Sequence, residues 1–360
     1  MNILIVRLDN IGDIMITSGI ACKVKDKYPT AKVVYLVRKI NAILPQMYGC
    51  IDNVIAYDSQ KSVFDTVKEI KSYNFDYIIM SGPDKGFLDI LQNIDVPIIR
   101  RIKTLSIEYL LKFMHFAIKL ESYNHVKIAT RKNTVTANLF FKIFPKLCSR
   151  LKNNKLLYLS DIKLVHESNR AELLLFPLGI TSLNDIATNN KNIASNFKAV
   201  GELPTKYMHY FAQDEKFNLV IHPGSNGHGE EWPLVKYIEL AKSLNKDKYN
   251  VFITGSEQEW LSHGKVICDS CPNVINLINK FNLQEFAIFL TRVDAVVASG
   301  TGPLHLAAAL GAHSLGLFPT KNAINSIRWM PLGEKVKVFE EKNTSLIKVN
   351  DIKKYLENIS

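Results

Sequence analysis

Residues 294–310 read DAVVASGTGPLHLAAAL, in which a strand pattern, a glycine-rich turn and a helix pattern follow one another directly. A short run of branched apolar residues is typical of a strand buried on both faces of a parallel sheet. The turn at residues 300–303 opens a helix over residues 304–310. A strand that feeds directly into a helix is half of a βαβ unit, so this stretch predicts a doubly wound α/β fold.

The same alternation continues on both sides of this stretch. The predicted strands of the C-terminal part are residues 217–222, 250–254, 274–277, 294–299 and 314–318, and those of the N-terminal part are residues 2–8, 31–37, 53–58, 75–80 and 96–101. Helix-length segments separate them, which predicts parallel sheets with right-handed crossovers. The chain has 360 residues, more than the roughly 250–300 that one hydrophobic core serves, so two domains are expected.

A polar, turn-rich segment around residues 182–191 indicates an inter-domain connection near it. We predict an N-terminal domain over residues 1–205 and a C-terminal domain over residues 206–345. Residues 346–360 are expected to form a helix with Asn350 as its N-cap, packing back towards the N-terminal domain.

Charge is concentrated in one block of the chain. Residues 100–155 hold thirteen Lys or Arg and two acids, a net +11 that equals the formal charge of the whole protein. Such a block favours an anionic partner, although a solvated basic surface explains it almost as well. Charge alone is no basis for nucleic-acid binding, which is not expected.

The cysteines and the apolar segments suggest a cytoplasmic enzyme. The five cysteines are odd in number in a large chain, so a disulfide framework is not expected. Residues 1–8 form a strand without a basic segment before it, unlike a secretory signal. Residues 105–120 are apolar, but their sixteen residues include three charges, too short and polar to span a membrane. They allow a peripheral contact with the inner face of the cytoplasmic membrane.

Ligands of doubly wound sheets bind where strands end, so four loops are candidate sites. In the first loop, Asn10 and Gly12 allow close approach of an acceptor, and the Asp13 carboxylate can take a proton from its hydroxyl or merely cap a helix. Gly224, Ser225 and Asn226 follow residues 217–222 and offer amides and small polar groups to a phosphate.

The other two loops complete the set. Glu259 follows the strand at residues 250–254, where an acid can hold ribose hydroxyls or act as a first-turn acid of a helix. Thr301, Gly302 and His305 lie at a helix start whose dipole favours a diphosphate. Glycine richness and a single histidine are each common for structural reasons, so only the combination carries weight. The dinucleotide fingerprint G-x-G-x-x-G is absent, which argues against a dehydrogenase.

Together these loops resemble glycosyltransferase family 9, the ADP-heptose:lipopolysaccharide heptosyltransferases. The matching stretches are ILIVRLDNIGDI at residues 3–14, HPGS and WP between residues 222 and 233, SGTGPLHLAAALG at residues 299–311, LFPT at residues 317–320 and IRWMPLG at residues 327–333. The resemblance implies a GT-B fold, with two Rossmann-like doubly wound domains facing a central cleft. It implies inverting, metal-independent transfer from a nucleotide sugar, with Asp13 as the base.

The resemblance also assigns binding roles and exposes departures. It implies donor contacts for Ser225, Glu259, Thr301, Gly302 and His305, and an anionic glycolipid acceptor that the basic block, with Arg100 and Arg101, would meet. The family has a basic residue where this chain has Glu230, and an Asp where it has Gly300. Arg328, Lys321 or His228 is expected to supply the missing cation beside the donor diphosphate. No cofactor is expected beyond the nucleotide sugar, ADP-heptose.

Two other functions remain open at this point. A nucleotide-sugar epimerase of the UDP-N-acetylglucosamine type has the same fold and would turn over the donor without an acceptor. A non-catalytic sugar-nucleotide-binding protein would bind nucleotide without turnover, and Glu230 and Gly300 leave that interpretation open.

Overall fold

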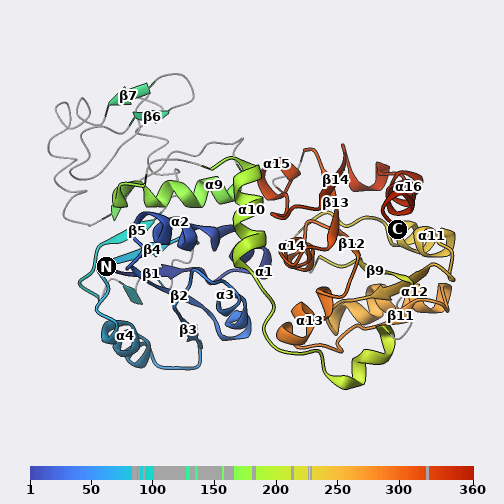
Figure 1. The fold of residues 1–360 in the computed structure, drawn as a ribbon, viewed down its shortest axis with the longest axis horizontal. Coiled ribbons are helices and arrows are strands. Elements are labelled where there is room, and N and C mark those ends of the chain that lie inside the picture. Colours follow the sequence, from blue (N-terminus) through green and yellow to red (C-terminus); the bar gives the residue numbers. More distant parts are fainter. Residues whose placement is uncertain are drawn as a thin grey trace. The chain divides into compact units, whose positions relative to one another are not determined.

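The computed structural model of the chain resolves into two compact units (Figure 1). It describes residues 1–82, 87, 90–91, 94–100, 127–129, 134–136, 156–157, 166–180, 184–211, 215–225, 227, 229–321 and 324–360. Unit 1 comprises Met1–Asp9, Ile20–Gln46 and Cys50–Leu183, and unit 2 comprises Asn10–Gly19, Met47–Gly49 and Asn184–Ser360. The main division therefore falls near residue 184 and not at residue 205, and two short N-terminal segments pack with unit 2.

Unit 1 is built on a parallel six-stranded sheet of order β3-β2-β1-β4-β5-β8. Its strands are β1 (Asn2–Val6), β2 (Lys32–Arg38), β3 (Asn53–Tyr57), β4 (Tyr77–Met80), β5 (Ile98–Arg100) and β8 (Leu156–Leu157), and β6 (Lys127–Ala129) pairs antiparallel with β7 (Thr134–Thr136). The helices are α2 (Gly19–Lys27), η1 (Lys39–Asn41), α3 (Ile43–Gln46), α4 (Val63–Ser72), α9 (Glu167–Glu172) and η2 (Leu173–Leu178). Strand order reverses between β1 and β4, the point where ligands of such sheets bind.

Unit 2 repeats this plan with a parallel six-stranded sheet of order β11-β10-β9-β12-β13-β14. Its strands are β9 (Phe217–His222), β10 (Tyr249–Ile253), β11 (Ile275–Asn276), β12 (Ala295–Ser299), β13 (His313–Pro319) and β14 (Val336–Glu341). Its helices are α1 (Ile11–Thr17), α10 (Ile186–Asn196), η3 (Thr205–Phe211), α11 (Leu234–Ser243), η4 (Trp260–Gly264), α12 (Lys265–Ser270), α13 (Leu283–Leu290), α14 (Gly302–Ala309), α15 (Ser326–Trp329), η5 (Thr344–Leu346) and α16 (Val349–Ile359). Here the order reverses between β9 and β12.

The core of unit 2 explains why its strands are so apolar. β12 is buried along its whole length because strands pair on both of its edges and helices cover both sheet faces. Asn282 and Glu285 form a reciprocal capping box that fixes the start of α13. Strand β14, which the sequence analysis did not predict, adds an edge strand whose half-exposed residues lack a clear apolar run.

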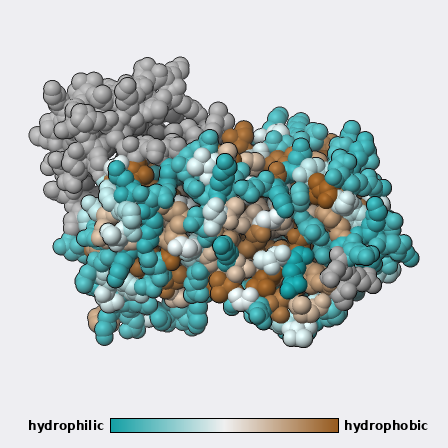
Figure 2. Space-filling view, in the orientation of Figure 1, coloured by the Kyte–Doolittle hydropathy of each residue, from teal (hydrophilic) through white to brown (hydrophobic). Residues whose placement is uncertain are grey.

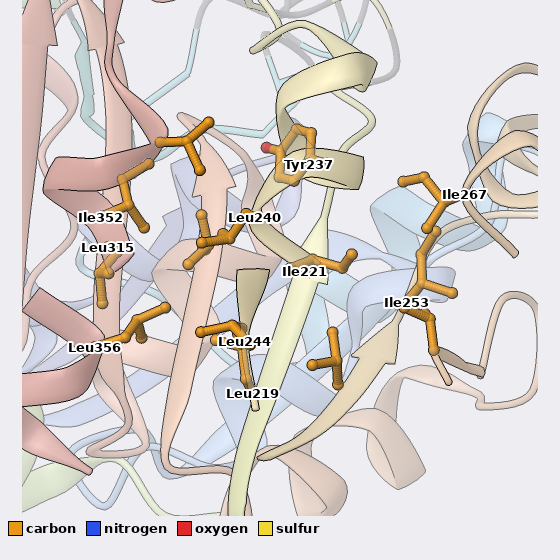
Figure 3. Close-up of a cluster of buried hydrophobic side chains, with 14 of the residues drawn as sticks. Leu219, Ile221, Tyr237, Leu240, Leu244, Ile253, Ile267, Leu315, Ile352 and Leu356 are labelled. Carbon is orange, nitrogen blue, oxygen red and sulfur yellow. The ribbon is translucent and has the colours of Figure 1, made fainter. Parts of the chain in front are cut away.

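Helix α16 packs inside unit 2, so its predicted return to the N-terminal domain is wrong. Its buried residues Ile352 and Leu356 lie toward Leu240 of α11 and Leu315 of β13 (Figure 3). An amphipathic helix packs its apolar face against another apolar surface, and here α11 and the sheet provide that surface. Lys348 occupies its N-cap position instead of the predicted Asn350.

One disulfide links Cys22 of α2 to Cys50 just before β3, a pairing that the sequence analysis, which expected no disulfide framework, did not predict. Their Cα atoms lie 4.9 Å apart, within the range that a disulfide bridges without backbone movement. Cysteine number and spacing in the sequence carried no information about this pairing, because helix–loop packing brings the two residues together.

The visible face of the protein is mostly hydrophilic, with small hydrophobic areas between the charged side chains (Figure 2). Ile40, Phe64 and Leu261 are exposed large hydrophobic residues, each carried by a different element. None of the described helices combines the length and apolar character that a membrane crossing requires.

Candidate functional site

Helix α1 lies directly against the N-terminal turn of α14, within unit 2. Glycines make this approach possible: a Cβ on Gly12 would lie 2.9 Å from His305 Cδ2, and a Cβ on Gly302 would lie 2.8 Å from Ile11 Cβ. Both distances are below the normal contact of two carbons. The structure therefore brings together the first and fourth candidate loops, at the residues the sequence singled out.

Asp13 lies in the first turn of α1, next to Gly12. The helix begins at Ile11, so Asp13 is part of the helix, and its side chain is half-buried. Ser18 separates α1 from α2. A carboxylate is stabilised by the positive end of a helix, and α1 itself and α14 both present such an end in this region.

The N-terminal turn of α14 has polar groups of the kind that bind anions. Thr301 is its N-cap and is only 8% exposed, yet its Oγ1 has no hydrogen-bond partner among the described residues. Buried hydroxyl groups are nearly always bonded to protein or water, so an unbonded one marks a place for a ligand or solvent. Amides of the first helical turn have no partner inside a helix. His305, one turn further along, is also buried.

The loop after β9 approaches Glu259 closely. A Cβ on Gly224 would lie 1.9 Å from Glu259 Oε1, so only glycine fits there. Glu259 is buried, and its Oε2 accepts hydrogen bonds from Ser256 N at 2.7 Å and Ser256 Oγ at 3.0 Å. The structure therefore joins the second and third candidate loops at the ends of β9 and β10.

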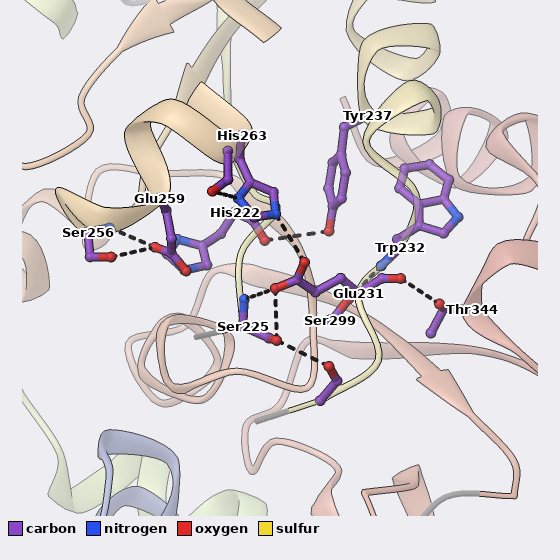
Figure 4. Close-up of polar contacts among 12 residues, drawn as sticks. His222, Ser225, Glu231, Trp232, Tyr237, Ser256, Glu259, His263, Ser299 and Thr344 are labelled. Atoms are coloured by element: carbon purple, nitrogen blue, oxygen red, sulfur yellow. Dashed lines mark hydrogen bonds and ion pairs between the residues drawn. The ribbon is translucent and has the colours of Figure 1, made fainter. Parts of the chain in front are cut away.

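The Glu231 carboxylate bridges Ser225 and His263 (Figure 4). Its Oε1 accepts from Ser225 N at 2.7 Å and Ser225 Oγ at 2.9 Å, and its Oε2 lies 3.0 Å from His263 Nε2. Partial burial raises the pKa of Glu231, but hydrogen bonds from His263 and Ser225 outweigh it and hold the pKa below its ordinary 4.5. Sequence reasoning missed His263, which follows no strand end and shows no motif.

His222 at the end of β9 is a structural histidine. Its Nδ1 lies 2.9 Å from Thr254 Oγ1 of the neighbouring strand end. Burial lowers the pKa of His222 below its ordinary 6.5, against the opposing charge of Glu259. The ring is therefore neutral at pH 7 and fixes the two strand ends relative to each other.

The two departures from the family pattern have structural explanations. Glu230 accepts from Thr344 N at 2.6 Å and Thr344 Oγ1 at 3.0 Å, so its carboxylate anchors the start of η5. A Cβ on Gly300 would lie 2.6 Å from Phe318 Cε1. The aromatic ring thus occupies the volume that an aspartate side chain would need, which excludes that side chain in this packing.

The structure describes only some of the basic residues predicted to bind the donor or the acceptor. The Arg328 guanidinium lies 5.0 Å from the Trp329 ring centre in α15, and Lys321 is exposed. Asn226, His228 and Arg101 lie outside the described residues, as does most of the basic block at residues 100–155. Arg100 ends β5, and only its backbone is described.

Unit 1 has a polar cluster at its own point of strand reversal. Arg7, 3% exposed, places its Nε 2.9 Å from Asp9 Oδ2 and donates to Ser81 O. Asn41 Nδ2 donates to Asp9 O at 3.2 Å. A Cβ on Gly82 would lie 2.6 Å from Asp9 Oδ2, so glycine makes room for this pair. Sequence analysis noted the loop but assigned no role to Arg7 or Asp9.

The sequence is similar to those of known glycosyltransferases. Residues 187–357 match the family described as glycosyltransferase family 9 (heptosyltransferase). The chain is 26% identical over 147 residues to the lipopolysaccharide core heptosyltransferase OpsX of Haemophilus influenzae, covering 40% of this chain and 42% of OpsX. It is 24% identical over 333 residues to lipopolysaccharide heptosyltransferase 3 of Escherichia coli, covering 89% and 83% of the two chains.

A solved structure shows the same fold. The E. coli heptosyltransferase WaaC with ADP superposes with a TM-score of 0.65 at 17% identity, covering 100% of both chains. Two Rossmann-like parallel sheets in this arrangement define the GT-B fold class. Within that class, the chain carries the domain of glycosyltransferase family 9, the heptosyltransferases, over residues 187–357, which confirms the resemblance read from its motifs.

Proposed function

We propose that this protein transfers heptose from ADP-heptose to a lipopolysaccharide-core or related surface-glycan acceptor, with inversion and with Asp13 as general base. The observation that carries the proposal is the packing of α1 on α14 through Gly12 and Gly302. The turn that bears Asp13 lies beside the N-terminus of α14, which supports a base and an anion site in one small region.

The donor is proposed to bind through unit 2. Its diphosphate would meet the α14 amides and Thr301 Oγ1, with Gly224, Ser225, Gly302 and His305 around it. Glu259, fixed by Ser256, would receive the ribose hydroxyls. The ADP bound in the related WaaC structure supports an adenine nucleotide. Backbone amides and a helix dipole stabilise a leaving diphosphate, so the transfer is proposed to need no metal ion.

In the transfer step, an acceptor hydroxyl gives its proton to the Asp13 carboxylate as its oxygen attacks the anomeric carbon. The bond from that carbon to the diphosphate oxygen breaks, and ADP leaves with the electron pair. Attack from the face opposite ADP inverts the anomeric centre. Charge develops on the sugar as in related acetal chemistry, and the departing oxygen is stabilised by the helix end.

The acceptor is proposed to be anionic. The lipopolysaccharide heptosyltransferases among its relatives point to a core glycan. The basic residues between 100 and 155 would meet acidic groups of such a glycan, or an anionic membrane surface beside it. Higher ionic strength is then expected to weaken acceptor binding more than donor binding.

Substitution of the base tests the proposal. Asp13→Asn removes a proton acceptor while keeping size, and transfer should fall by about 10²–10⁴-fold with ADP affinity retained. Asp26→Asn, at an exposed acid of the next helix, should leave transfer unchanged. Transfer is followed as ADP release and by NMR of the product's anomeric configuration. Full activity of the Asp13 variant, retention of configuration, or turnover without an acceptor would each rule this mechanism out.

A further inference from the structure

The Glu231 carboxylate sits where an incoming anion would bind. One of its oxygens accepts both the backbone N–H and the hydroxyl of Ser225, at 2.7 and 2.9 Å. The Ser225 hydroxyl has a single proton, and Gly229 O at 3.2 Å is a longer and uncharged alternative. The charged acceptor therefore takes the better hydrogen bond. A neighbouring amide and hydroxyl are the donors that proteins use to hold a phosphate oxygen.

The Ser225 loop also lies at the proposed donor site. A Cβ on Gly229 would be 3.9 Å from Gly300 O, and Trp232 N donates to Ser299 Oγ at 3.2 Å. The loop after β9 thus runs along the turn that opens α14, at the strand reversal of unit 2. Since two anions cannot share the same two donors, the carboxylate and a phosphate oxygen exclude each other at Ser225.

We propose that Glu231 is a displaceable internal ligand of the donor site and sets its affinity for the nucleotide diphosphate. A phosphate oxygen takes Ser225 N–H and O–H only when the carboxylate leaves them. Glu231 Oε2 keeps His263 Nε2 as its partner, 3.0 Å away, so the released carboxylate remains hydrogen-bonded. This inference rests on the proposed function, because it takes a nucleotide diphosphate as the ligand of this loop.

The neighbouring acid supplies a matched control. Glu230 carries the same charge one residue away, but Thr344 N and Oγ1 hold it at 2.6 and 3.0 Å. Glu231 is the acid that accepts from Ser225 N and Oγ. Neutralising Glu230 therefore changes the net charge near the loop by the same amount without vacating the Ser225 donors.

The test is calorimetric titration of the full chain with ADP at pH 7. Glu231→Gln should tighten ADP binding about tenfold, because a neutral amide oxygen competes less well than a carboxylate for these donors. Glu231→Asp keeps the charge but shortens the reach, and should also tighten binding. Glu230→Gln should stay within about twofold of the parent protein. Melting temperatures are recorded for each variant, and Glu231→Asp decides alone if Glu231→Gln does not fold.

The outcomes separate the inference from the function it rests on. Unchanged or weaker ADP binding by the Glu231 variants, with normal binding by the parent, overturns the inference and leaves the donor proposal standing. Equal tightening by Glu230→Gln and Glu231→Gln also overturns it, since net charge would then be the cause. Failure of the parent and all variants to bind ADP overturns both.

Discussion

Adding one methyl group at Gly12 should separate the two helices on which the proposed mechanism depends. The new Cβ of Gly12→Ala would lie 2.9 Å from His305 Cδ2 and 3.3 Å from Nε2. Carbon atoms in contact prefer about 3.5–4.0 Å, so α1 must move off α14 by about 0.6–1.1 Å. The His305 ring is buried and cannot turn into solvent to make room.

The expected effect falls on the rate more than on donor binding. A misplacement of about 1 Å at a reacting group costs about 10²-fold in rate, so kcat should fall by about that factor. ADP affinity should change little, because the α14 amides stay in place. Overpacking should also lower the free energy of unfolding by about 1–3 kcal/mol. Steady-state transfer assays, ADP titration and thermal melting measure the three quantities.

Gly19→Ala is the matched control. Gly19 opens α2, and a Cβ there has no heavy atom within 4 Å among its surroundings. The same chemical change should leave kcat unaltered and raise stability by up to about 0.5–1 kcal/mol through the helical preference of alanine. If Gly12→Ala matches Gly19→Ala in kcat and melting temperature, the tight contact and the mechanism built on it are both refuted.

Three further predictions concern stability. Lys23→Met should lower the free energy of unfolding by about 3–5 kcal/mol, because it removes the cation that lies 2.7 Å from the buried Glu172 carboxylate. Urea unfolding should show the loss, and adding Glu172→Leu should recover much of it. Burial lowers the pKa of His222, so as the pH drops below 6.5 the unfolded chain takes up a proton at this residue before the folded chain does, and the free energy of unfolding should fall. The melting temperature of His222→Gln should therefore depend less on pH in this range than that of the parent protein. An equal pH dependence would contradict a lowered pKa of His222. The cysteines of the Cys22–Cys50 disulfide are 28 positions apart in the sequence, so reducing it should lower the free energy of unfolding by about 3–4 kcal/mol on the loop-entropy model. Dithiothreitol should have no such effect on the Cys22→Ser/Cys50→Ser variant.

Local sequence patterns located most of the strands and the loops that matter. The stretch 294–310 forms β12, its glycine turn and α14 almost as predicted, because a fully apolar run followed by glycine leaves few other structures. The edge strand β14 was missed for the opposite reason, since half its side chains face solvent and its pattern is mixed. Helix α16 was recognised, but its packing surface lies far away in the sequence and was misjudged.

In the candidate site, too, the sequence predicted individual residues but not the contacts between them. Sequence patterns alone singled out Asp13 as a candidate base, and Thr301, Gly302 and His305 as candidates for binding an anion. The sequence did not predict that Gly12 packs on His305. The residues around each of them form the same local pattern whether or not the two helices are in contact.

The sequence by itself determined two successive βα arrays and the family to which their motifs point. Only the tertiary structure decided that α1 belongs to unit 2 and that Cys22 bonds to Cys50. Only it showed that adjacent acids have opposite roles, with Glu230 anchoring Thr344 and Glu231 occupying Ser225. The physical reason is range: periodicity and propensity act over a few residues, whereas contacts between distant segments depend on how the whole chain packs.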